Sequence, residues 1–156
     1  MVEKHVLYEV KGYVAVITLN RPKAKNAFSP EMIKLWRECL EKAKADDNVR
    51  AIVVTGKGDT FCSGGDIRDM ADGKLKSWDM KRFLWDGVHR IVLTLEDLDK
   101  PVIAAINGAA MGAGMDMAIM CDLRVCSDRA KLAESYIMMG LIPGDGGAYF
   151  LPRLTG

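Results

Sequence analysis

The first third of the chain places hydrophobic and polar residues in patterns that predict a hairpin followed by a helix. Two β-branched runs, HVLYEV and YVAVITL, are separated by Lys11-Gly12, which is typical of a β-hairpin. After the polar segment NRPKAKNAFS, Ser29 is predicted to cap a helix that has Pro30 at its first position. Apolar residues then recur at helical spacing, at Met32, Ile33, Trp36, Cys39, Leu40 and Ala43.

The rest of the chain alternates between strand and helix patterns. RAIVVTG is a continuously apolar run, typical of a parallel sheet that is covered on both faces, and VIAAI and DLRVCS are further predicted strands. An amphipathic helix is predicted from about Trp78 to Leu98, a short helix over about 112–120, and a helix start at about residue 146. Residues 56–76 are predicted to be irregular, with a helical turn after Asp66. This alternation predicts an α/β fold with mainly parallel strands.

Composition and charge narrow the class of protein. The 156 residues are 49% hydrophobic and 28% charged, which suits a single globular domain. Net charge is +1, without the basic stripe that binding to nucleic acid or to a membrane surface would require. No apolar run is long enough to cross a bilayer, and the N-terminal segment lacks the apolar core of a signal peptide. We therefore expect a cytoplasmic protein with no nucleic-acid or membrane partner.

The cysteines do not indicate a metal site. They form no C-x-x-C pair, and only His5 and His89 could assist them as ligands, so no metal is expected. Reduced thiols that are buried as small hydrophobic side chains are the interpretation for all four residues, Cys39, Cys62, Cys121 and Cys126.

Two glycine-containing segments carry the candidate chemistry. TFCSGGDI (60–67) and AAMGAGMD (109–116) each follow a predicted strand and place small residues before an acid. Small residues let a ligand approach the backbone, and the free N–H groups at a helix start favour an anion or a developing negative oxygen. Tight turns and close packing would explain the same glycines. A dinucleotide fingerprint is disfavoured because Met117 stands where its third glycine would be.

Four segments in order resemble the crotonase family of enoyl-CoA hydratases and isomerases. They are VAVITLNRPKAKNAFS, AIVVTGKGDTFCSGGDI, KPVIAAINGAAMGAGMDMAIMCDLRVCS and MGLIPGDGGAYFLPRLTG. The resemblance implies that residues 1–156 form one acyl-CoA-binding catalytic domain, a spiral of ββα units. Family chains continue into helices that cover the acyl pocket and build a trimer or a dimer of trimers. The chain is thus expected to be an N-terminal portion from which this C-terminal helical part is missing.

The same resemblance implies roles for individual residues. Two backbone N–H groups, those of Gly65 and Ala113, would form an oxyanion hole for the thioester carbonyl. For Lys25 a solvated loop lysine is the alternative to a role in binding coenzyme A. No cofactor is implied, because coenzyme A is part of the substrate. The residues placed against coenzyme A are Lys25, Ala27, Ser63, Gly65, Asp66 and Ile67.

The chain departs from the family pattern at the catalytic acids. A typical hydratase holds a water molecule between two glutamates; the first aligns with Asp116 and the second with Tyr136. If the segment is extended, Glu134 points to the same side as Tyr136. Asp145, within IPGDGG, is an acid that the usual hydratase pattern lacks there. Asp116 could transfer a proton or only complement the helix dipole, Tyr136 could donate a hydrogen bond or only pack, and Asp145 could be a second acid or a turn residue.

The resemblance therefore implies an enzyme of acyl-CoA metabolism and leaves its reaction open. An enoyl-CoA hydratase, acting on a 2-enoyl-CoA or a cyclic dienoyl-CoA in fatty or aromatic acid degradation, is the leading hypothesis. A double-bond isomerase is the first alternative, because isomerisation needs only a proton relay. A homologue that binds coenzyme A esters without catalysis is the second, motivated by the lost glutamate.

Overall fold

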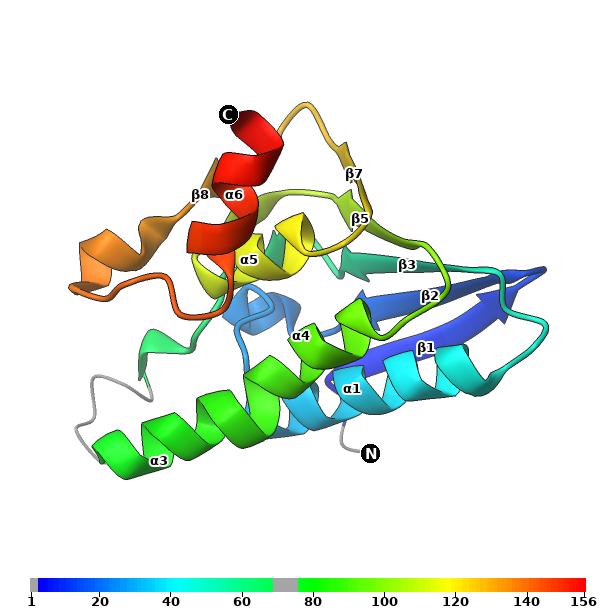
Figure 1. Ribbon diagram of the computed structural model, residues 1–156, viewed down its shortest axis with the longest axis horizontal. Helices are drawn as coiled ribbons and strands as arrows, with labels where there is room; N and C mark the ends of the chain where they lie inside the picture. Colours follow the sequence, from blue (N-terminus) through cyan, green and yellow to red (C-terminus); the bar gives the residue numbers. More distant parts are fainter. Residues whose placement is uncertain (1–2, 69–75) are drawn as a thin grey trace.

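A computed structural model gives the fold of residues 3–68 and 76–156 (Figure 1). Strands β1 (Val6–Lys11) and β2 (Val14–Leu19) pair antiparallel, with Lys11 opposite Val14. Gly12 in the turn has φ of 58°, a left-handed conformation that favours glycine. The predicted hairpin is confirmed.

Helix α1 (Pro30–Ala45) begins at the predicted residue. The Met32 N–H donates a 3.1 Å hydrogen bond to Ser29 Oγ, so the serine caps the helix start as expected. The predicted apolar face packs into the core, although Cys39 is only half-buried. Its buried members are Met32, Ile33, Trp36, Leu40 and Ala43.

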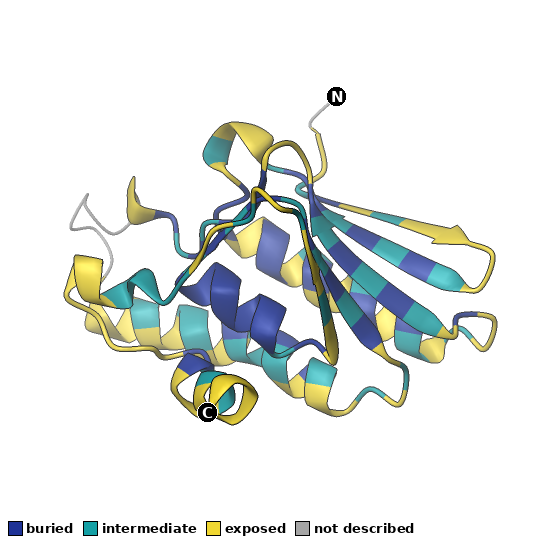
Figure 2. Ribbon diagram, turned by 90° about the horizontal axis from the view of Figure 1, so that it is seen from above, coloured by how far each residue is buried: buried dark blue, intermediate teal, exposed yellow. Residues whose placement is uncertain are grey.

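The main sheet has five strands in the order β1-β2-β3-β5-β7. Strands β3 (Ala51–Gly56), β5 (Val102–Ile106) and β7 (Leu123–Cys126) run parallel to β2. Buried and half-buried residues alternate along β2, β3 and β5 (Figure 2). The expectation that the RAIVVTG run lies in a sheet covered on both faces is therefore wrong: one face of β3 is buried, and the other keeps partial exposure.

A second sheet, which the sequence patterns did not predict, aligns the candidate site. Strands β4 (Thr60–Cys62), β6 (Ala109–Met111) and β8 (Leu132–Ala133) pair in parallel in that order. Parallel strands end at the same edge of a sheet. The segments that follow all three strands are thereby brought to one edge, although they lie far apart in sequence.

The predicted helix over about 78–98 is present but not uniform. It consists of α3 (Ser77–Arg82), the π-helical segment η2 (Phe83–Val88) and α4 (His89–Glu96), and η2 and α4 pack beside α1 (Figure 1). Ile67 and Arg68 are helical, in agreement with the turn expected after Asp66. The remainder of that expectation, residues 69–75, lies outside the described residues.

The remaining helices are short. Helix α5 (Ala113–Ile119) is buried along its whole length (Figure 2), and the turns η1 (Pro22–Ala24) and η3 (Ser135–Met139) lie in the connecting segments. Helix α6 (Gly147–Thr155) packs against α5. None of the helices within residues 3–68 and 76–156 has the length and apolarity that crossing a bilayer requires.

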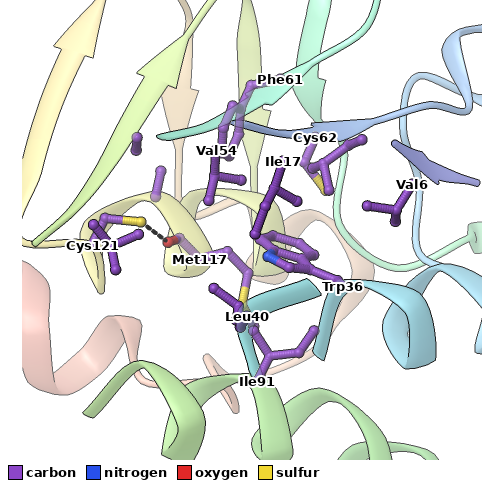
Figure 3. Packing of buried hydrophobic residues seen from close by; sticks show 14 of the residues in the cluster. Val6, Ile17, Trp36, Leu40, Val54, Phe61, Cys62, Ile91, Met117 and Cys121 are labelled. Atoms are coloured by element: carbon purple, nitrogen blue, oxygen red, sulfur yellow. Dashed lines mark hydrogen bonds between the residues drawn. The ribbon is translucent and has the colours of Figure 1, made fainter. Parts of the chain in front are cut away.

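One hydrophobic core joins α5 to the rest of the domain. Met117 of α5 reaches toward Leu40 and Trp36 of α1, beneath Ile17 and Val54 from the main sheet (Figure 3). All five side chains have at most 1% of their surface exposed. Because close-packed interiors leave side chains little freedom, α5 is a rigid base for the acid that it carries.

Candidate active site

The two glycine-containing segments meet at the start of α5. Gly64 has φ of 80°, and a Cβ atom there would lie 2.8 Å from the Met111 carbonyl oxygen and 3.1 Å from the Ala113 nitrogen. Within residues 3–68 and 76–156, neither the Gly65 N–H nor the Ala113 N–H donates a hydrogen bond. Two unpaired backbone donors on adjoining loops are what a developing oxyanion requires.

The first loop is fixed against the segment around Lys25. The Ser63 N–H donates to the Lys25 carbonyl at 3.1 Å, and the Phe28 N–H donates to the Gly64 carbonyl at 2.8 Å. Asn26, which is fully buried, donates through its side-chain amide to the carbonyls of residues 57 and 60. This bridging asparagine was not singled out from the sequence. The two segments that the resemblance assigns to coenzyme A therefore lie side by side.

The predicted coenzyme A residues differ in what they can offer a ligand. Lys25 is exposed, and its ammonium pairs with Asp59 at 3.0 Å. Ile67 is exposed, Ser63 and Gly65 are half-buried, and Ala27 is buried. Gly65, which has no side chain, and the buried Ala27 would therefore contact a ligand chiefly through the backbone.

The carboxylate of Asp66 is already engaged within the protein. It accepts two hydrogen bonds, of 2.9 and 2.8 Å, from the Arg68 guanidinium, and Arg21 lies 3.6 Å away. Hydrogen bonding from Arg68 holds the pKa of Asp66 below its usual range. The charged form is thus favoured, and the side chain anchors the loop.

Asp116 lies on the first turn of α5 and has no solvent exposure. Its Oδ2 accepts a hydrogen bond from the Tyr136 hydroxyl at 2.5 Å, whereas its Oδ1 has no hydrogen-bond partner among the described residues. An unpaired buried carboxyl oxygen is unfavourable in a finished fold. Such an oxygen is available to a substrate or a water molecule.

Glu134 supplies a second carboxyl beside Asp116. A Cβ atom on Gly147 would lie 2.1 Å from Asp116 Oδ1 and 2.5 Å from Glu134 Oε1, so the two oxygens converge on one point. Both Glu134 oxygens are buried and receive no hydrogen bond from an N–H or hydroxyl group in the described part of the chain, so a bond to Asp116 forms only when one of the two carboxyls is protonated. Burial, then hydrogen bonding to Asp116 and the negative charges of Asp116 and Asp145, raise the pKa of Glu134 to about 7.

The condition set for this placement, an extended segment, is not met. The segment is not extended, since Glu134 precedes the 3₁₀ turn Ser135–Met139. Glu134 reaches the acid because β8 ends directly before it, at the edge where β6 leads into α5. The parallel pairing of these short strands, and not side-chain alternation along a strand, brings Glu134 and Tyr136 to Asp116.

Asp145 joins the cluster through Tyr136. Its Oδ2 lies 3.0 Å from the Tyr136 hydroxyl, which therefore contacts two carboxyls. Burial, followed by the negative charge of Asp116, raises the pKa of Asp145 above its usual range, although Tyr136 and His89 act in the opposite direction. Burial and the charge of Asp145 also raise the pKa of Tyr136, so its phenol stays protonated. Burial thus favours the protonated forms of Asp145 and Tyr136.

His89 is the residue at this site that the sequence analysis missed. Its Nε2 lies 3.3 Å from Asp145 Oδ1 and 3.1 Å from the Gly144 carbonyl oxygen. These contacts join residues 55 and more positions apart, so no local pattern could have indicated them. From the sequence, His89 was considered only as a possible metal ligand beside the cysteines.

The cysteines play no part in the cluster. All four are free; burial raises the pKa of the Cys62 and Cys121 thiols to about 12, so both stay protonated. Cys126 is exposed, which corrects the expectation that every cysteine is buried; it lies on β7, at the edge of the main sheet. In the parts of the chain that the structure describes, no group of three or more potential ligands is placed to hold a metal ion.

Comparisons with known proteins show which family the sequence and the fold resemble. A sequence model described as enoyl-CoA hydratase/isomerase matches residues 9–156. The chain is 37% identical to the short-chain-enoyl-CoA hydratase of Clostridium acetobutylicum and 37% identical to the 1,2-epoxyphenylacetyl-CoA isomerase of Escherichia coli, covering 97% of this chain in each case. The crystal structure of an enoyl-CoA hydratase from Bacillus anthracis superimposes with a TM-score of 0.91 at 30% identity, over 97% of this chain and 58% of that one. The chain likewise spans 58% of the length of the two curated relatives.

Proposed function

Because the chain belongs to the enoyl-CoA hydratase/isomerase family, we propose that it acts on an acyl-CoA thioester and adds water to the double bond of a 2-enoyl-CoA or a cyclic dienoyl-CoA. One observation carries the choice of hydration. Asp116 has a carboxyl neighbour, Glu134, and the facing oxygens of the two are buried and receive no hydrogen bond from any third group within the described residues. The pair replaces the two glutamates of a typical hydratase, with the second acid supplied from two positions earlier in the chain.

The chemistry follows from the charge that develops on the thioester. The N–H groups of Gly65 and Ala113 bind the carbonyl oxygen and stabilise the negative charge that appears there as the enolate forms. Asp116 lies about one helical turn beyond Ala113, which is close enough to reach the α- and β-carbons of the bound acyl group.

Asp116 and Glu134 divide the proton transfers between them. As the oxygen of water bonds to the β-carbon, the ionised member of the pair takes one of the water protons. The protonated member gives its proton to the α-carbon, so the pair holds the same number of protons before and after the reaction. The pKa of about 7 at Glu134 suits an acid that must both gain and lose a proton near neutral pH.

Isomerisation is the second candidate function, and one observation favours it. Tyr136 stands at the position of the second glutamate and holds Asp116 through a 2.5 Å hydrogen bond, an arrangement that needs no water. A single acid could then move a proton between carbons of the acyl chain. The similarity to an isomerase at 37% identity is compatible with either reaction.

The oligomeric state, the cellular compartment and the absence of a separate cofactor are further parts of the proposal. We propose that the full-length protein forms a homotrimer or a dimer of trimers in the cytoplasm and uses no cofactor beyond the coenzyme A of its substrate. Exposed apolar side chains between Tyr136 and Asp145 in the sequence support a subunit interface at this segment. They include Ile137, Met138 and Ile142, which expose 79%, 82% and 85% of their surface.

The test uses the full-length protein and a panel of 2-enoyl-CoA and cyclic dienoyl-CoA esters, with the mass of each product followed over time. Hydration adds the mass of one water molecule to the ester, and isomerisation leaves the mass unchanged while the double bond moves. Unchanged esters together with measurable binding would identify a protein that binds coenzyme A esters without catalysis. That result would refute the proposed enzyme function.

A further inference from the structure

A continuous series of side-chain contacts leads from the buried acid to the protein surface. The Tyr136 hydroxyl lies 2.5 Å from Asp116 and 3.0 Å from Asp145, and the other oxygen of Asp145 lies 3.3 Å from His89 Nε2. Asp116 is inaccessible to solvent, whereas His89 keeps 28% of its side chain exposed. We propose that these four residues form a proton relay in which His89 supplies protons from solvent to Asp116.

The hydrogen-bond partners give the relay a direction. A carbonyl oxygen can only accept, so the 3.1 Å contact with the Gly144 carbonyl requires a proton on His89 Nε2. The Tyr136 hydroxyl has one proton, and its shorter contact directs that proton to Asp116. The contact between Tyr136 and Asp145 is then satisfied when Asp145 donates to the phenol oxygen. The donors of Asp145 and Tyr136 then face toward Asp116, and the single Nε2 proton of His89 lies between the Gly144 carbonyl and Asp145.

Proton transfer along this path is balanced at each step. An imidazolium at His89, formed by uptake of a proton from water, gives its Nε2 proton to Oδ1 of Asp145. Asp145 releases the proton on Oδ2 to the oxygen of Tyr136, and Tyr136 passes its own hydroxyl proton to Asp116. One proton has moved from solvent to Asp116, and Tyr136 and Asp145 each end with the number of protons they had at the start.

The π-helical segment explains why His89 occupies this place. The widened turn of η2 ends at Val88, directly before His89, and such turns often occur at functional sites because they re-aim the residues that follow. Val88 and Ile91 are buried in the core, while His89 faces the loop that carries Asp145.

The other charged groups near His89 are engaged elsewhere. On its own helix Asp86 pairs with Arg82, and Arg90 stacks on Trp85, whose ring meets His89 edge-on at 6.1 Å. From the facing loop Asp145 contacts the imidazole directly, with Asp116 and Glu134 behind it. Asp145 is thus the carboxyl that can exchange a proton with His89.

The relay rests on the proposed function, and its first test is kinetic. In the full-length protein His89→Ala should lower kcat about tenfold or more, with KM for crotonyl-CoA unchanged, because the residue acts through Asp145 and not on the ester. Added imidazole should restore much of the lost rate, which a purely structural role would not permit. His5, the other histidine, is hydrogen-bonded to Ser29, so His5→Ala is the matched control. Its kcat should stay normal and should not rise when imidazole is added. An unaltered kcat, or a loss that imidazole does not restore, would overturn the relay.

A second measurement tests the relay even if the full-length protein hydrates no ester, a result that would refute the proposed function alone. The infrared spectrum of the protein should contain the C=O stretch of a protonated carboxyl, and this band should be absent from the spectrum of Asp145→Asn. The same band should shift in Tyr136→Phe and in His89→Gln, because each removes or alters one hydrogen bond to Asp145. A spectrum in which Asp145→Asn removes no such band would exclude a protonated Asp145 and, with it, the relay.

Discussion

The Tyr136 hydroxyl donates a 2.5 Å hydrogen bond to Oδ2 of Asp116, the sole acid on α5. Tyr136→Phe keeps the ring and removes this donor. A hydrogen bond to a charged group contributes about 1.5–3 kcal/mol. If the transition state loses this stabilisation, kcat should fall about ten- to a hundredfold. Steady-state kinetics of the full-length variant on crotonyl-CoA would measure this, with KM expected to stay near that of the natural protein. An unchanged kcat would mean that the tyrosine only packs.

The oxyanion hole can be tested without removing a side chain. Ala113 is the first residue of α5, a position where proline is tolerated because its N–H has no partner within the helix. Ala113→Pro deletes the proposed donor and should lower turnover about a hundredfold or more. Ala113→Gly retains the N–H and is the matched control, for which activity close to normal is expected. If a folded Ala113→Pro protein turns over at the normal rate, the oxyanion is bound elsewhere.

Features that depend on neighbouring residues could be predicted from the sequence. The hairpin around Gly12 and the start of α1 are examples, because a turn and a helix cap involve residues at most three or four positions apart. The resemblance aligned Asp116 and Tyr136 with the two glutamates of a typical hydratase, and Asp145 stood out as an acid that the family pattern lacks; the structure joins these three through the Tyr136 hydroxyl. Which of them carries the reaction stays a prediction.

Features that depend on distant contacts could not be predicted. The strands of the second sheet have two or three residues, too few to leave a periodic pattern, and they pair across tens of residues. The contact between His89 and Asp145 likewise exists only after α4 and the loop before α6 have packed. Whether the segment at Glu134 is extended could not be decided from the sequence, because the 3₁₀ turn that follows it has no strong sequence signal.

Because Gly147 has no side chain, the carboxyls of Asp116 and Glu134 can approach each other beside it. A methyl group there would lie 2.1 Å from Asp116 Oδ1 and 2.5 Å from Glu134 Oε1, far closer than nonbonded atoms approach. Gly147→Ala should therefore push the carboxyls apart and reduce kcat about a hundredfold, because displacements of about 1 Å can have effects of this size. Ala148→Ser adds one atom at the exposed neighbouring position and should leave kcat unchanged. Equal activity of the two variants would argue against a functional carboxyl pair.

Glu134 should make the stability of the fold depend on pH. Its pKa is about 7 in the folded protein against a reference value of 4.5, so between these pH values the folded state binds more protons than the unfolded state. The free energy of unfolding should consequently fall as pH rises through this window, and the full loss is reached above pH 7. The loss is at most about 3 kcal/mol, and less because solvent screens part of the effect.

The matching variant is Glu134→Gln, which cannot ionise. Urea unfolding of both proteins between pH 4.5 and 8 should show a difference in unfolding free energy that moves in favour of the glutamine variant as pH rises. Asp145, whose pKa is also raised, is present in both proteins, so the difference reports the ionisation of Glu134 together with its electrostatic interaction with Asp145. A pH-independent difference between the two proteins would show that the pKa of Glu134 is not raised by folding.

Asp116 is predicted to be the principal proton-transfer group. It is fully buried, it lies one turn from the Ala113 N–H, and its Oδ1 is unpaired among the described residues while Tyr136 holds its Oδ2. Asp116→Asn keeps the shape of the side chain and removes its basicity. Binding of a coenzyme A ester should stay near normal, and turnover should fall about a hundred- to ten-thousandfold.

The neighbouring acids provide the comparison that makes this prediction specific. Glu134→Gln should impair hydration strongly, because the water would lose one of its two carboxyls, whereas Asp145→Asn should have the smaller effect of a lost relay step. Calorimetric titration with a saturated acyl-CoA, which cannot be hydrated, would separate loss of binding from loss of chemistry in all three variants. Suppose instead that Asp116→Asn keeps most of the activity and Asp145→Asn abolishes it. The proton transfer would then belong to the loop before α6, and Asp116 would serve to orient Tyr136 toward it.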